Sequence, residues 1–117
     1  MQIMSTKLQK EDGKSVALSS DLFDKVVSSD TPTVVDFWAE WCAPCRYMHP
    51  IFERLAKQYN GGIRFARVNV DENEGLAVRY RVFSIPTFAI FKQGKLLETV
   101  IGAVGEGELK KLIHKYA

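Results

Sequence analysis

The 117-residue chain lacks several features by which large classes of protein are recognised. No apolar stretch approaches the roughly 18 residues of a membrane-spanning helix, so we expect no membrane partner. Lysine and arginine number 16 against 14 acidic residues and form no run, which argues against a nucleic-acid partner. The opening MQIMSTKLQKEDGKS has no apolar segment typical of a signal peptide. We therefore expect a cytoplasmic location.

Cysteine is also scarce: the chain has two, Cys42 and Cys45, within the stretch WCAPCR. The pair could be half of a metal site, a static staple, or a disulfide that opens and closes. Structural disulfides are rare in the cytoplasm, which weakens the staple. A closed zinc site usually takes four ligands in two close clusters, whereas His49 would add one ligand and His114 lies far along the chain. The motif favours redox chemistry over metal binding, and we expect no metal.

Hydrophobic periodicity divides the rest of the chain into alternating strands and helices. Residues 1–14 show no periodicity and are predicted to form a flexible N-terminal tail before one domain over residues 15–117. The pattern predicts an α/β fold with a central mixed five-stranded β-sheet flanked by four α-helices. The first helix is expected to be capped by Ser20 or Asp21. Strands are expected within 15–19, 31–39, 63–70, 87–91 and 96–102, and helices within 19–30, 42–59, 72–82 and 105–117.

The spacing of the two cysteines suits a reversible disulfide at the start of a helix. Residues at i and i+3 in a first helical turn have Cα atoms about 5 Å apart, within the range for a disulfide. Free backbone N–H groups there stabilise a thiolate and lower its pKa. Pro44 suits an early helical position, where its missing N–H costs nothing. We therefore expect Cys42 to be the exposed, attacking thiol and Cys45 to be the resolving thiol.

Several further motifs, taken in order, resemble the thioredoxin family over residues 15–117. VVDFWAEWCAPCR is similar to the family's active-site stretch, and Pro50 to its helix-kinking proline. FARVNVDEN resembles the third strand, SIPTF the cis-proline loop, and FKQG followed by IGA the final hairpin. The resemblance implies a thioredoxin fold and a protein-disulfide reductase that donates electrons to disulfide-containing target proteins. It also implies no bound cofactor, with electrons coming from NADPH or ferredoxin through a separate thioredoxin reductase, and a monomer.

The resemblance assigns roles to individual residues as well. Asp36 matches a buried acid that gives and accepts protons beneath the cysteines; a charge within the apolar stretch VVDFW is already unusual. Trp38 matches the more buried of the family's two tryptophans, Trp41 the exposed one beside the cysteines, and Pro86 would follow a cis peptide bond. The substrate-binding surface would comprise Trp41, Ala43, Pro44, Ile85, Pro86, Ile101, Gly102 and Ala103.

Three residues depart from the family pattern. Ala43 replaces the usual glycine, Arg46 a common lysine, and Arg67 a lysine that lies near the buried acid in many relatives. Arginine does not lose its proton, so its effect on Asp36 would be a fixed electrostatic one. These changes bear on redox potential and target preference.

Two other functions remain open at this point. The chain could be a binding module whose disulfide stays idle, or an oxidant or isomerase of disulfides. The Ala-Pro dipeptide offers no histidine to stabilise a thiolate strongly, which argues against a strong oxidant. Reduction of insulin with dithiothreitol separates a reductase from a binding module, because the latter would not accelerate it.

Overall fold

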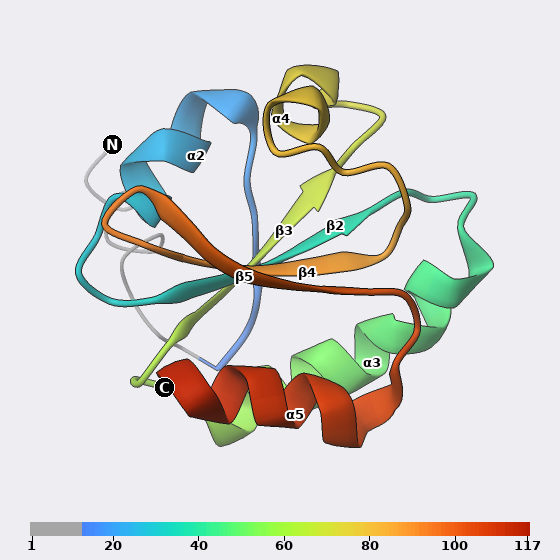
Figure 1. Cartoon of the computed structure of the whole chain (residues 1–117). Helices are drawn as coiled ribbons and strands as arrows, with labels where there is room; N and C mark the ends of the chain where they lie inside the picture. The colour runs from blue at the N-terminus through green and yellow to red at the C-terminus, as the bar shows by residue number, and fades with distance from the viewer. Residues whose placement is uncertain (1–12) are drawn as a thin grey trace.

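A computed structural model of the chain describes residues 13–117 and confirms the predicted fold class. Five strands form one mixed sheet in the order β1-β3-β2-β4-β5, in which β1, β3 and β2 pair in parallel and β4 runs antiparallel to both of its neighbours, β2 and β5. Helices α2 and α4 cover one face and α3 and α5 the other (Figure 1). The elements are β1 (Val16–Ala17), α2 (Ser20–Val27), β2 (Thr33–Trp38), α3 (Ala43–Gln58), β3 (Arg64–Asn69), α4 (Glu74–Arg79), β4 (Thr87–Lys92), β5 (Lys95–Ile101) and α5 (Gly105–Tyr116).

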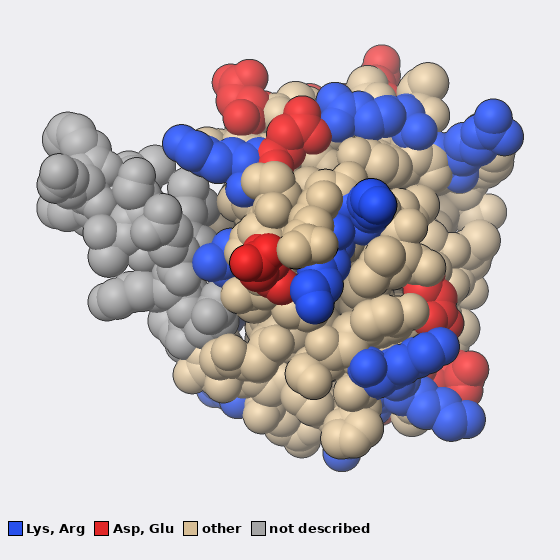
Figure 2. All heavy atoms as spheres, turned by 60° about the vertical axis from the view of Figure 1, so that its left-hand side comes forward, with Lys and Arg blue, Asp and Glu red and all other residues tan. Residues whose placement is uncertain are grey.

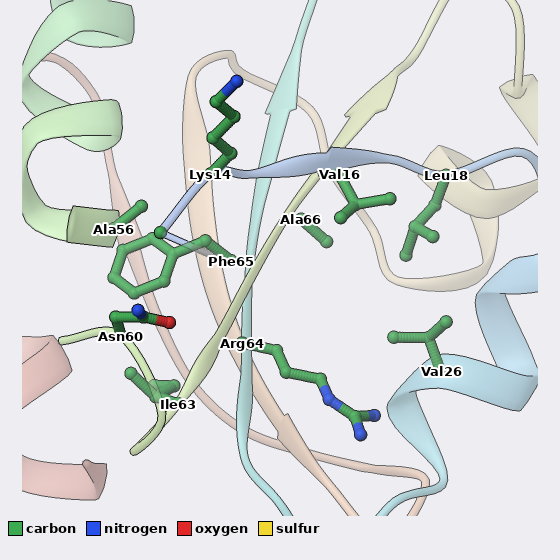
Figure 3. A pocket seen from close by; sticks show the side chains of 11 residues that line it. Lys14, Val16, Leu18, Val26, Ala56, Asn60, Ile63, Arg64, Phe65 and Ala66 are labelled. Atoms are coloured by element: carbon green, nitrogen blue, oxygen red, sulfur yellow. The ribbon is translucent and has the colours of Figure 1, made fainter. Parts of the chain in front are cut away.

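The central strand β2 has both faces covered, as its run of apolar residues predicts. Successive side chains alternate between the two layers. Val34 packs with the α3 and α5 side chains, whereas Val35 and Phe37 pack with those of α2 and α4. Figure 3 shows the same alternation in β3, where Phe65 points toward Ala56 of α3 and Arg64 extends toward α2. The alternation therefore fixes which layer each β2 side chain faces.

The start of α2 differs from the prediction. The helix begins at Ser20, with Ser19 as its N-cap, one residue earlier than a Ser20 cap implies and two earlier than an Asp21 cap implies. The hydroxyl and backbone N–H of Ser20 both donate to Asn73 Oδ1, at 3.0 Å each. Ser20 therefore links α2 to the start of α4, a long-range contact that local capping preferences cannot anticipate.

The predicted tail over residues 1–14 lies outside the described residues, apart from Gly13 and Lys14. Where the description begins, Ser15 donates from both its backbone N–H and its hydroxyl to Glu53 of α3. Within residues 13–117, no helix is both long and apolar enough to cross a membrane. Basic and acidic side chains are interspersed on the face shown in Figure 2.

The sheet pairing brings three connections to one end of the molecule. Phe37 of β2 pairs with Thr87 at the start of β4, and Thr87 pairs with Ile101 at the end of β5. The β2–α3, α4–β4 and β5–α5 connections therefore all lie at this end (Figure 1). The carboxyl end of β2 lies here, and active sites of α/β proteins usually form outside the carboxyl ends of the strands.

Candidate functional site

The two cysteines lie at the start of α3 and are joined by a disulfide, with their Cα atoms 5.2 Å apart. Cys42 is the N-cap residue of the helix, and its Sγ accepts a hydrogen bond of 3.2 Å from the backbone N–H of Cys45. Pro44 occupies an early helical position, as expected. Of the two sulfurs, Cys42 Sγ is the one toward which a free helical N–H points.

The expected exposure of Cys42 is wrong for this disulfide form. The residue is 3% exposed and Cys45 is fully buried. Helix position indicates which sulfur meets the backbone N–H, but it says nothing about the segments that cover it. The cysteines pack in a small cluster with Ala39, Trp38, Val70 and Ile85.

The α4–β4 connection closes over Cys42. The Ile85–Pro86 peptide bond is cis, as the resemblance implied. The Ile85 carbonyl oxygen lies 3.7 Å from Cys42 Sγ, and the Pro86 carbonyl accepts a 2.8 Å hydrogen bond from Gly102 N–H. Ile85 is half-buried and Pro86 buried, so it is the backbone of this loop that borders the sulfur.

The residues predicted to bind substrate, called the apolar rim below, differ in their exposure. Trp41 is 67% exposed, and its indole N–H donates to Asp71 Oδ2 at 2.8 Å, which fixes the orientation of the ring. Ala43, Pro44 and Ala103 are exposed, Ile101 is 60% exposed, and Gly102 is half-buried. Asp71 was not predicted as a site residue, because a loop acid gains this role only when the end of β3 places it beside Trp41.

Asp36 is fully buried on the sheet face that α3 covers. It follows Val34 by two residues on β2 and pairs across the sheet with Phe88, and both of these pack against α3. Arg67 Nε donates to its Oδ2 at 3.2 Å, while Oδ1 has no hydrogen-bond partner among residues 13–117. The chain therefore holds an incompletely satisfied carboxyl beneath the helix that carries the cysteines.

Burial raises the pKa of Asp36 from 3.8 to about 6. The cation of Arg67 opposes this effect through its charge and its hydrogen bond, and the negative charge of Glu53 adds to the rise. Loss of hydration thus outweighs the ion pair. Arg67 is itself almost buried, at 11% exposure, and its guanidinium carbon lies 4.1 Å from the centre of the Trp38 ring.

Glu53 connects this charge pair to the N-terminal end of the described chain. Partial burial acts to raise the pKa of Glu53, but hydrogen bonds from Ser15 and His49 outweigh it, so the pKa lies below its ordinary value. His49 Nε2 lies 3.1 Å from Glu53 Oε2, a helical i, i+4 pair. His49 was considered above as a possible metal ligand. In the structure its ring pairs with the carboxylate of Glu53.

No group of three potential metal ligands among histidine, cysteine, aspartate and glutamate occurs within the described part of the chain. A separate cavity of about 20 Å³ lies beside β3, between the ends of α2 and α3, and its lining includes Val26, Asn60 and Phe65 (Figure 3). It has room for about one water molecule. Its lining contains no residue of the cysteine site.

One exposed side chain in the loop that borders the cysteines was not predicted from the sequence. Phe83, in the α4–β4 connection, is 89% exposed. The sequence context VFSIP gives no sign of this, because an apolar residue in such a run is ordinarily expected to be buried.

Comparison with known proteins agrees with this geometry. A sequence model of the family described as Thioredoxin matches residues 14–115. Thioredoxin from Porphyra purpurea is 42% identical over 92 residues, covering 79% of this chain and 86% of that protein. Chloroplastic thioredoxin M4 from Arabidopsis thaliana is 46% identical over 79% of this chain, which spans 48% of that protein's length.

A solved structure of thioredoxin from Malassezia sympodialis superposes with a TM-score of 0.85 at 34% identity, covering 89% of this chain and 91% of that one. The fold, the cysteine pair at the helix start and these similarities agree. The chain therefore belongs to the thioredoxin family, and it acts in thiol–disulfide exchange as a protein-disulfide reductase.

Proposed function

We propose that Cys42 attacks the target disulfide and that Cys45 resolves the product. The Cys42 thiolate forms a bond to one target sulfur and releases the other as a thiolate, which takes up a proton. The Cys45 thiolate then attacks Cys42 Sγ, forms the Cys42–Cys45 disulfide and releases the second target thiolate. Two electrons pass from the protein to its target, and the protein ends in the oxidised form.

One observation carries this order: the Cys45 backbone N–H donates to Cys42 Sγ at 3.2 Å. When the disulfide opens, the same N–H can stabilise a thiolate on Cys42, together with the positive end of the α3 dipole. Cys45 is buried one turn further along α3. Burial in apolar surroundings raises the pKa of a thiol, so Cys45 should ionise less readily.

Two serine variants test the order. Cys42→Ser should abolish turnover in the insulin assay with dithiothreitol, whereas Cys45→Ser should accumulate mixed disulfides that dithiothreitol releases. The reduced wild-type protein should be alkylated by iodoacetamide at Cys42 well before Cys45. Equal alkylation rates for the two thiols would contradict the assignment, and wild-type protein that fails to accelerate insulin reduction would instead indicate a binding module.

We propose that Asp36 mediates proton transfer to or from Cys45 during resolution. It lies on the sheet face covered by α3, and its pKa of about 6 places its proton exchange close to neutral pH. A buried negative charge on Asp36 costs stability, and Oδ1, which has no hydrogen-bond partner among residues 13–117, leaves that charge only partly compensated. A residue kept for stability alone would be apolar here, which supports a role in the reaction.

We also propose that the target chain binds across the exposed rim and pairs with the backbone of Ile85. The rim residues are Trp41, Ala43, Pro44, Ile85, Pro86, Ile101, Gly102 and Ala103. Two observations support this surface: the Ile85 carbonyl oxygen is 3.7 Å from Cys42 Sγ, and Ile101 is the last residue of β5 at the same end of the sheet. Measuring how Trp41→Ala and Ile101→Ala change KM for insulin would test this surface.

We propose that the protein acts as a monomer in the cytoplasm and that a separate reductase recharges it from NADPH or ferredoxin. A dithiol donor needs a reducing compartment, which supports the location. Recharging can be followed with purified NADPH-dependent and ferredoxin-dependent reductases in turn, and oligomeric state by sedimentation. We further propose that residues 15–117 form one independent domain.

A further inference from the structure

Phe83 has an exposed ring that belongs to none of the apolar core clusters of the described residues. It is 89% exposed, whereas Val82 and Ile85 on either side of the Phe83–Ser84 pair pack partly against the α2 and α4 layer. Single exposed apolar side chains are common and indicate nothing alone. This one lies two residues before Ile85, whose carbonyl oxygen is 3.7 Å from Cys42 Sγ, and that position gives it its interest.

The segment that carries Phe83 is held at several points by hydrogen bonds. Val82 N–H donates to the Ala77 carbonyl at 2.8 Å, and the Thr87 hydroxyl donates to the Ser84 carbonyl at 2.6 Å. The backbone on both sides of Phe83 is therefore restrained. A phenylalanine held in this way offers apolar contact area at little cost in conformational entropy.

Phe83 lies close along the chain to the backbone that borders Cys42. It precedes Ile85 by two residues, a span of at most about 7 Å, and the Ile85 carbonyl oxygen is 3.7 Å from Cys42 Sγ. The α4–β4 connection lies at the same end of the sheet as the start of α3 (Figure 1). Trp41 and Ile101, exposed by 67% and 60%, belong to this end as well. Phe83 thus extends the apolar rim along the loop that borders the sulfur.

We propose that Phe83 is a specificity-determining contact for target proteins with an apolar side chain about two residues from the attacked cysteine. The proposal rests on the proposed function, in which Cys42 attacks the target disulfide. A target strand that follows the backbone at Ile85 places residues near its cysteine over the Phe83 ring. Covering much of a phenylalanine side chain gains enough free energy to favour such targets by roughly tenfold.

The test uses the full chain in its reduced form in single-turnover reactions, so that no reductase takes part. The probes are two synthetic peptides, each with one intramolecular disulfide. They differ only at the residue two positions from the attacked cysteine, outside the disulfide loop, which is leucine in one peptide and serine in the other. Hydroxyethyl disulfide, which has no side chains to contact Phe83, reports the wild-type thiol chemistry alone. The ratio of the second-order rate constants for the two peptides is the measured quantity.

The variants are Phe83→Ala, Phe83→Leu and, as a matched control, Leu97→Ala. Leu97 is an exposed apolar residue of β5, at 44% exposure, next to Leu96, which pairs with Phe91 toward the opposite end of the sheet from Ile101. The wild-type protein and Leu97→Ala should prefer the leucine peptide by roughly tenfold. In Phe83→Ala the ratio should fall to about threefold or less, and Phe83→Leu should restore most of it.

Equal rates on the two peptides in the wild type would overturn the proposal, as would an unchanged ratio in Phe83→Ala. Sedimentation that shows a dimer dissociated by Phe83→Ala would also overturn it, because the ring would then contact a second copy of the chain. If the wild type reduces neither peptide nor hydroxyethyl disulfide, the proposed function fails and this proposal with it. Reduction of hydroxyethyl disulfide with equal peptide rates refutes the role of Phe83 alone.

Discussion

Replacing Asp36 by asparagine should stabilise the oxidised protein at neutral pH, an unusual result for a buried polar position. Asp36 is fully buried, and its pKa is about 6 because loss of hydration outweighs the attraction of Arg67. Asparagine has the shape of the protonated carboxyl group and carries no charge. The substitution therefore removes the cost of the buried anion while it keeps the packing of β2 against α3.

The size of the effect follows from the raised pKa. Because the folded state binds the Asp36 proton more tightly than the unfolded state, the carboxyl costs no stability below pH 3.8, costs more as pH rises, and reaches its full cost above pH 6. The rise of the pKa of Asp36 from 3.8 to about 6 corresponds to about 3 kcal/mol in the free energy of unfolding. Asp36→Asn should match the wild type near pH 3.5 and exceed it by about 3 kcal/mol at pH 8.

Urea unfolding of the two oxidised proteins across pH 3.5 to 8 measures this difference. Thr33→Val is a matched control, because Thr33 lies on the same strand and its buried Oγ1 also lacks a hydrogen-bond partner among residues 13–117. Its removal should add about 1 kcal/mol or less, and the gain should not change with pH because threonine does not titrate. If Asp36→Asn is less stable at pH 8, or if its advantage is constant with pH, the account of the buried charge is wrong.

Three further predictions concern Arg67, Arg81 and the N-terminal segment. Arg67→Met removes the cation that opposes the effect of burial, so the pKa of Asp36 should rise above about 6 in a carbon-13 NMR titration; a lower value would contradict the ion pair. Arg81 has φ of +56° at the end of α4, so Arg81→Gly should raise the unfolding free energy by about 1 kcal/mol in urea, and a loss would refute strain there. Deleting residues 2–12 should leave insulin reduction unchanged and the melting temperature nearly so, since that segment has no apolar periodicity; a large loss in either would show that it packs on the domain.

Much of the fold follows from local patterns in the sequence. The apolar run of β2 and the stripe of α3 predict buried elements because burial repeats with the period of each element, and the structure confirms both. The stretch FKQG, which resembles the family's final hairpin, contains Gln93 and Gly94, and these two residues join β4 to β5. These predictions succeed because each depends on residues that are close together in the chain.

The features that sequence reasoning missed depend on contacts between distant segments. Cys42 is nearly buried because Val70 and Ile85 belong to other elements and pack against it. The Trp41–Asp71 hydrogen bond joins residues 30 positions apart. Phe83 shows the opposite deviation: an apolar residue that the sequence suggests is buried is exposed. Its neighbours Val82 and Ile85 pack against the core, and Phe83 does not.

Arginine at position 67 gives the buried acid a permanent electrostatic partner. Its guanidinium contacts both Asp36 and the Trp38 ring, and the arginine side chain is a permanent cation in proteins. A lysine there could share a proton with the acid, and the two groups would then titrate as a coupled pair. With arginine, the charge of this pair changes through Asp36 alone. The pH dependence of stability and the proposed proton transfer to Cys45 should therefore report the same carboxyl group, which makes each a check on the other.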